Sequence, residues 1–78
     1  MNREFGDGFY TSVFVQDLQQ GFSGLELRRH RKGTDECIAK VIFWDACGQF
    51  FVEMSGTEVP LEILEELIAE AKKTIKIA

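Results

Sequence analysis

Residues 37–54 read CIAKVIFWDACGQFFVEM, and this stretch decides the fold. Its first part, Cys37 to Trp44, is rich in β-branched and aromatic residues, and so is its last part, Gln49 to Met54. The segment between them, Asp45-Ala46-Cys47-Gly48, contains the Asp and Gly that favour a tight turn. The stretch therefore predicts an antiparallel β-hairpin.

Two more strands are predicted on the N-terminal side of this hairpin. Leu25 to Arg31 is a charged strand, joined to the hairpin by a turn at Lys32-Gly33-Thr34-Asp35. Phe9 to Gln16 is a strand rich in aromatic and β-branched residues, followed by the polar connection Asp17 to Gly24. The preceding Gly6-Asp7-Gly8 is interpreted as a flexible lead-in, because a phosphate-binding glycine loop follows a strand and opens a helix.

The C-terminal segment changes to a helical period at Pro60 and keeps it to about Ile75. Apolar residues recur there at intervals of three and four, which is typical of an amphipathic helix. This apolar stripe consists of Leu61, Leu64, Ile68, Ala71 and Ile75, widened by Ile63 and Leu67. We therefore expect an α+β fold, in which a four-stranded antiparallel meander carries one C-terminal helix on one face. A chain of 78 residues is enough for a single domain, 1–78.

Strand register decides which residues face the helix. A three-residue loop, Ala46 to Gly48, would set Trp44 opposite Phe50, and a four-residue loop at Lys32–Asp35 would set Arg29 opposite Ile38. The expected helix-facing residues are then Leu25, Leu27, Ile38, Ile42, Trp44, Phe50, Val52 and Met54. The other face would hold Glu26, Arg28, His30, Cys37, Ala39, Val41, Phe43, Phe51 and Glu53. A four-residue loop, Asp45–Gly48, is the alternative, and it would mix the two sets.

Composition excludes several classes of protein. Thirteen acidic residues against nine basic ones give a net charge of −4, which argues against non-specific nucleic-acid binding. No apolar run is long enough to span a bilayer, and we expect a cytoplasmic protein without a membrane partner. The two cysteines are expected to be reduced, because a predicted strand holds them too far apart for a disulfide.

Three groups of polar residues are candidates for chemistry. Arg28, Arg29, Arg31 and Lys32 could contact phosphates, but strand alternation divides them between two faces. A charged strand end, or a contact with an acidic protein, explains them more simply. His30 is expected opposite Cys37, where the pair could form a thiolate nucleophile. No cysteine or histidine spacing matches a zinc site, so we expect no metal and no cofactor.

The face without the helix is the strongest candidate for binding. It is expected to present Val41, Phe43 and Phe51 at its centre, with Arg28 and Glu53 at its margin. An apolar centre inside a charged rim is typical of an interface, and symmetric dimers are the commonest assemblies. The sequence therefore predicts a non-enzymatic interaction module that forms a homodimer. The alternatives are another protein as partner, a small enzyme using Cys37 and His30, and nucleic-acid binding through Arg28–Lys32.

Overall fold

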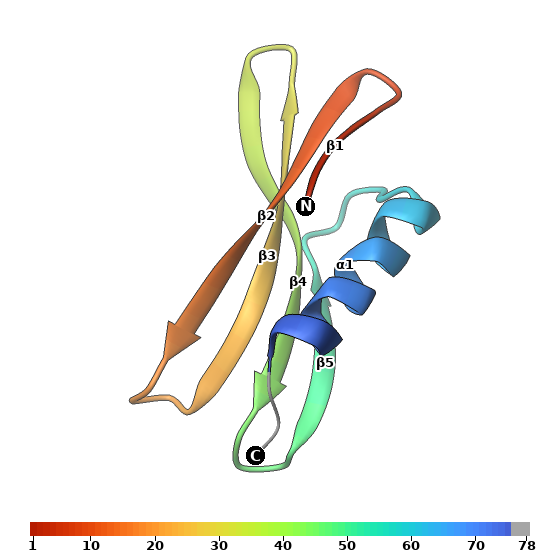
Figure 1. Ribbon diagram of the computed structural model, residues 1–78. Helices are drawn as coiled ribbons and strands as arrows, with labels where there is room; N and C mark the ends of the chain where they lie inside the picture. The colour runs from red at the N-terminus through yellow and green to blue at the C-terminus, as the bar shows by residue number, and fades with distance from the viewer. Residues whose placement is uncertain (76–78) are drawn as a thin grey trace.

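The computed structural model describes residues 1–75, which form one antiparallel sheet and one helix (Figure 1). The strands are β1 (Asn2–Phe5), β2 (Gly8–Asp17), β3 (Phe22–Arg31), β4 (Thr34–Trp44) and β5 (Gln49–Met54), and the helix is α1 (Leu61–Thr74). The strands lie side by side in chain order. The sheet is strongly twisted, and α1 lies across one of its faces (Figure 1). The predicted α+β class is confirmed.

The predicted strand count is wrong, because residues 1–75 contain five strands and not four. Gly6 has a φ of 62°, and Gly6-Asp7 forms a two-residue turn that pairs Phe5 with Gly8. A hairpin turn of this length demands a positive φ, which glycine adopts without strain. The segment interpreted as a flexible lead-in is therefore the turn of the first hairpin.

The register between β3 and β4 also differs from the prediction. Lys32 and Gly33 both have positive φ and form a two-residue turn, so that Arg29 lies opposite Glu36. Further along, a bulge shifts the register between Leu27 and Arg28, and Leu27 lies opposite Ala39. A bulge adds one unpaired residue to one strand, here Ile38. Because side chains alternate along a strand, that single residue reverses the orientation of the rest of β4.

Because of this reversal, the predicted assignment of β4 residues to the two faces is wrong beyond Ile38. Ala39, Val41 and Phe43 lie in the core beneath the helix, whereas Ile42 and Trp44 occupy the opposite face. The turn before β5 is the four-residue alternative, with Trp44 opposite Gln49. This longer turn returns β5 to the orientation that was predicted for it. The residues found on their predicted, helix-facing side are Leu25, Leu27, Ile38, Phe50, Val52 and Met54.

Helix α1 begins after Pro60 and covers the centre of the sheet, where it contacts β3 and β4. Its buried residues are Ile63, Leu67 and Ala71, while Leu64 and Ile68 are only partly buried against the same core. Leu61 is 70 % exposed, contrary to the predicted stripe. The inward face of the helix is therefore turned by about one residue from the predicted one.

Candidate functional site

The uncovered face of the sheet, which we call the open face, is the face opposite α1. Strand pairing places its residues in rows that run across the strands. Those named below are Phe9, Val13, Phe22, Gly24, Glu26, Arg28, His30, Asp35, Cys37, Lys40, Ile42, Trp44, Phe51 and Glu53. They divide into an apolar end and a charged end.

The apolar end is built around Ile42 in β4. Ile42 is buried although no element covers it. Its side chain lies against Gly24 of β3, where the absence of a glycine side chain leaves room for it. Phe51 of β5 is paired with Ile42 in the same row, and its side chain is half exposed. In the next row the rings of Phe22 and Trp44 lie 5.1 Å apart at a tilt of 59°. Tilted aromatic pairs of this kind form a rigid apolar surface.

The charged end is built around Arg28 in β3. Its Nη1 lies 3.4 Å from Oε1 of Glu26, and its Nε lies 3.3 Å from Oδ1 of Asp35. The hydrogen bond that it donates to Asp35 raises the pKa of Arg28 above its ordinary value. Lys40 Nζ lies 3.9 Å from Glu26, and Glu53 is paired with Lys40 in the sheet. The charges at this end therefore neutralise one another to a large extent.

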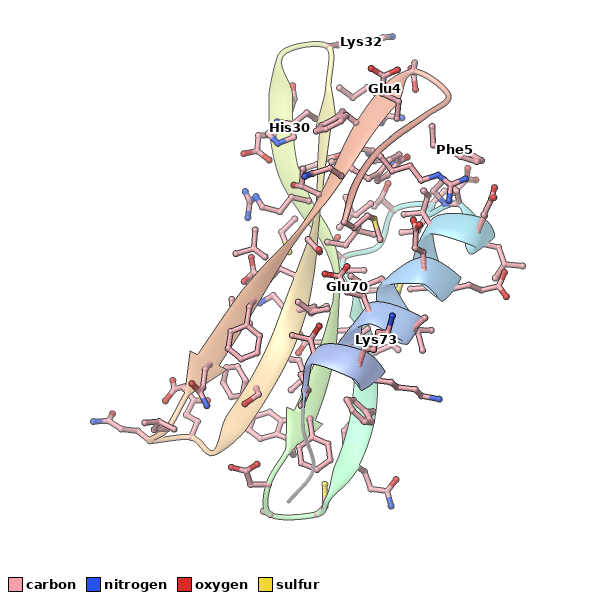
Figure 2. All side chains as sticks on the ribbon, viewed as in Figure 1. Glu4, Phe5, His30, Lys32, Glu70 and Lys73 are labelled. Atoms are coloured by element: carbon pink, nitrogen blue, oxygen red, sulfur yellow. The ribbon has the colours of Figure 1, made fainter. Side chains whose placement is uncertain are left out.

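The structure does not gather the basic residues of the segment Arg28–Lys32 into one phosphate-binding surface. Arg28 lies on the open face in the ion pairs just described, whereas Arg29 is buried on the helix side. Arg29 donates hydrogen bonds to Glu36, to Thr57 and to the carbonyl oxygen of Glu58. Exposed Arg31 and Lys32 lie at the turn of the β3–β4 hairpin, where Figure 2 shows Lys32 at the tip.

The predicted contact between His30 and Cys37 is wrong. In the observed register His30 lies opposite Asp35, with Nε2 of His30 3.7 Å from Oδ1 of Asp35. Cys37 lies opposite Arg28, and its thiol points to the carbonyl oxygen of Ala39 at 3.7 Å. The two-residue turn at Lys32-Gly33 is the physical cause, because it moves β4 by two positions relative to β3.

His30 borders an open hollow of about 480 Å³ between the β1–β2 and β3–β4 turns. Glu4, Phe9, Lys32 and Asp35 also line this hollow. Cys37 lines a different one, with Lys40 and Met54. The candidate nucleophile and its candidate base therefore do not share a cleft, which catalysis by such a pair requires.

Within residues 1–75, no group of three or more histidine, cysteine or acidic side chains could hold a metal ion. No helix in that range is long and apolar enough to cross a membrane.

Two of the five predicted interface residues lie elsewhere. Val41 and Phe43 are buried beneath α1, because the bulge at Ile38 turns them inward. Phe51, Arg28 and Glu53 do lie on the open face.

Sequence reasoning missed the exposure of the opposite side of β5. Val52 and Met54 face the helix layer but remain 46 % and 47 % exposed, because α1 covers β3 and β4 and leaves β5 largely bare. An available signal was the width of the sheet, since one helix cannot cover all of the four strands that the sequence predicts.

Comparison of the chain with protein-family models, with curated proteins and with solved structures found no match.

Proposed function

We propose that this chain is a small, non-enzymatic protein-interaction module that acts as a homodimer in the cytoplasm. The observation that carries the proposal is the concentration of exposed apolar side chains on one strand. In β5, Phe51, Val52 and Met54 are each 46–50 % exposed. Phe51 lies on the open-face side of this edge strand, and Val52 and Met54 lie on its helix side, so that both sides of the strand are apolar. Exposed apolar patches mark interaction sites.

The small size of the chain favours association with a second copy. A 78-residue chain buries a small fraction of its own surface, so association adds burial that the monomer lacks.

The interface predicted from the sequence is retained in part. The proposal keeps Phe51 and Glu53, which lie on β5. Val41 and Phe43 are buried beneath α1, and Arg28 is held in ion pairs on β3, away from β5. Both cysteines are free, which fits the reducing environment of the cytoplasm.

Sedimentation equilibrium at micromolar concentration tests the proposal. The expected mass is twice the 8.9 kDa of one chain. Phe51→Glu places a charge in the patch and should dissociate the dimer. Leu18→Glu is the matched control, because Leu18 is 83 % exposed in the β2–β3 connection, away from β5. A wild-type protein with the mass of one chain at these concentrations contradicts the proposal.

A further inference from the structure

The outer edge of β5 carries backbone groups that are available for pairing. β5 is the last strand of the sheet and pairs with β4 on one side only. Beyond its end, Ser55 N–H donates to the carbonyl oxygen of Ile38 at 3.2 Å, in continuous register with Met54 opposite Ala39. In an antiparallel ladder, hydrogen-bonded and non-hydrogen-bonded pairs alternate. The N–H and C=O groups of Phe50, Val52 and Met54 therefore point outward, away from β4.

This edge has few of the features that normally prevent strand-to-strand association. Protected edges carry charged side chains, lysine above all, or proline or a bulge, or are very short. β5 reads QFFVEM, is six residues long and pairs with β4 without a bulge, and Glu53 is its one charged residue. The opposite edge differs: β1 has four residues, and its Arg3 is bound to Glu62 and Glu66 of α1. One edge of the sheet is therefore covered by β1 and tied to the helix except at residues 13–17 of β2, whereas β5 is unpaired on its outer side along its whole length.

The flanks of α1 show the same asymmetry. Glu62 and Glu66 lie on the flank that contacts β1, and Glu70 binds the N-terminal amine on that side. At 100° per residue, Leu64 and Ile68 lie on the opposite flank. Both pack against the core cluster that Phe50 of β5 also touches. The helix thus presents an apolar flank toward the open edge and an ion-paired flank away from it.

We propose that β5 pairs in antiparallel fashion with β5 of a second copy about a two-fold axis at Val52, forming one continuous ten-stranded sheet. This inference rests on the proposed homodimer and names its interface. With Val52 opposite the partner's Val52, Phe50 lies opposite the partner's Met54, and all three outward-pointing positions find partners. Because the side chains of each opposed pair share a face, these contacts are apolar throughout.

Charge is compatible with this register. On the open face, Glu53 lies opposite the partner's Phe51, so that the two Glu53 carboxylates are not directly opposed. On the helix layer, a two-fold axis makes the two helices antiparallel, and the two β5 strands lie between them because α1 covers β3 and β4. The arrangement leaves the open faces of both copies on the same side of the joined sheet.

A pair of matched lysine variants tests the edge. Val52 and Phe14 are 46 % and 48 % exposed, both face the helix layer, and both lie in strands with an unpaired outer edge at that point. Val52→Lys would oppose two like charges on the axis and should raise the dissociation constant by about tenfold or more. Phe14→Lys should leave it unchanged. Circular dichroism confirms that each variant is folded, and equal dissociation constants for both overturn the inference.

Crosslinking provides a second measurement that does not depend on destabilising the dimer. In a Cys37→Ser, Cys47→Ser background, Val52→Cys should form a disulfide-linked dimer on mild oxidation. Residues that form a hydrogen-bonded antiparallel pair have Cα atoms about 5.5 Å apart, which is within disulfide range. Val13→Cys, on the open face, should remain monomeric on a non-reducing gel. Crosslinking of Val13→Cys but not of Val52→Cys shows face-to-face assembly and overturns the inference.

The results separate this inference from the proposed function. A wild-type protein that sediments as a monomer overturns both. A wild-type dimer that persists in Val52→Lys but dissociates in Val13→Glu retains the homodimer and overturns the β5 edge as its interface.

Discussion

Arg29 of β3 holds Glu36 of β4 directly across the sheet, with Nη2 of Arg29 2.7 Å and Nε 3.1 Å from the same carboxylate oxygen. The guanidinium also bonds the Thr57 hydroxyl and the Glu58 carbonyl, in the connection that leads to α1. Only 4 % of Arg29 is exposed. The hydrogen bond to Glu36 raises the pKa of Arg29 above its ordinary value, so the side chain stays charged over the accessible pH range. One buried cation thus ties the β3–β4 hairpin to the segment that positions the helix.

Replacing Arg29 by Met should destabilise the fold by about 2–3 kcal/mol, because charge-assisted hydrogen bonds are lost and the Glu58 carbonyl loses a donor. Glu36 is partly exposed and can be hydrated, which keeps the cost below that of breaking a fully buried ion pair. Urea denaturation measures the change. Arg31→Met is the control, since Arg31 is exposed, and it should change stability by no more than about 0.5 kcal/mol. Similar losses in both variants would contradict a special role for Arg29.

Replacing Ile63 by Ala should cost about 2–5 kcal/mol, because Ile63 is fully buried at the centre of the helix–sheet interface and leaves a cavity. Leu61→Ala, two residues earlier and largely exposed, should cost about 0.5 kcal/mol or less. Leu64→Ala, at the margin of the core, should fall between them. Thermal unfolding followed by circular dichroism gives the order. A larger effect at Leu61 than at Ile63 would show that the helix packs through the other face.

Gly24→Ala should destabilise the sheet by about 1–3 kcal/mol, because the added methyl group overpacks the space between two strands. A Cβ at this position would lie 2.8 Å from the backbone oxygen of Val41 and 3.4 Å from Cγ1 of Ile42. The backbone oxygen cannot move without shifting β4. Ser23→Ala, beside it on the same strand, serves as the control in the same urea titration. An unchanged midpoint for Gly24→Ala would mean that β3 and β4 separate more easily than their packing suggests.

The two thiols should react separately and never with each other. Cys47 is exposed in the β4–β5 turn, and Cys37 is partly buried near the other end of β4. Iodoacetamide should therefore modify Cys47 in the native protein before Cys37, and mass spectrometry of the peptides reports the order. Denaturation in urea should equalise the two rates. An intramolecular Cys37–Cys47 disulfide in the unreduced protein would be incompatible with β4.

The sequence alone was sufficient for the α+β class, for the bounds of β5 and for a C-terminal helix, which was predicted to begin at Pro60 and begins one residue later. β5 was predicted and observed at Gln49–Met54, because its composition and the turn before it are strong local signals. The helix has a period that no strand shares. The alternation of side chains along a strand also divided the basic residues of Arg28–Lys32 between two faces, and this alternation holds wherever a strand is regular.

Tertiary structure alone decided which residues of β4 face the helix. Beyond the bulge, Ala39, Val41 and Phe43 form one alternating row of β4, and Lys40, Ile42 and Trp44 form the other. The hydrophobic pattern separates the rows only at Lys40, and that one lysine, set against two large apolar residues in each row, did not identify the core. The bulge at Ile38 gives the row with small Ala39 to the helix and leaves bulky Trp44 to pair with Phe22 on the open face. Such a choice depends on how side chains from distant segments fill a shared volume, and the order of residues along one strand does not record it.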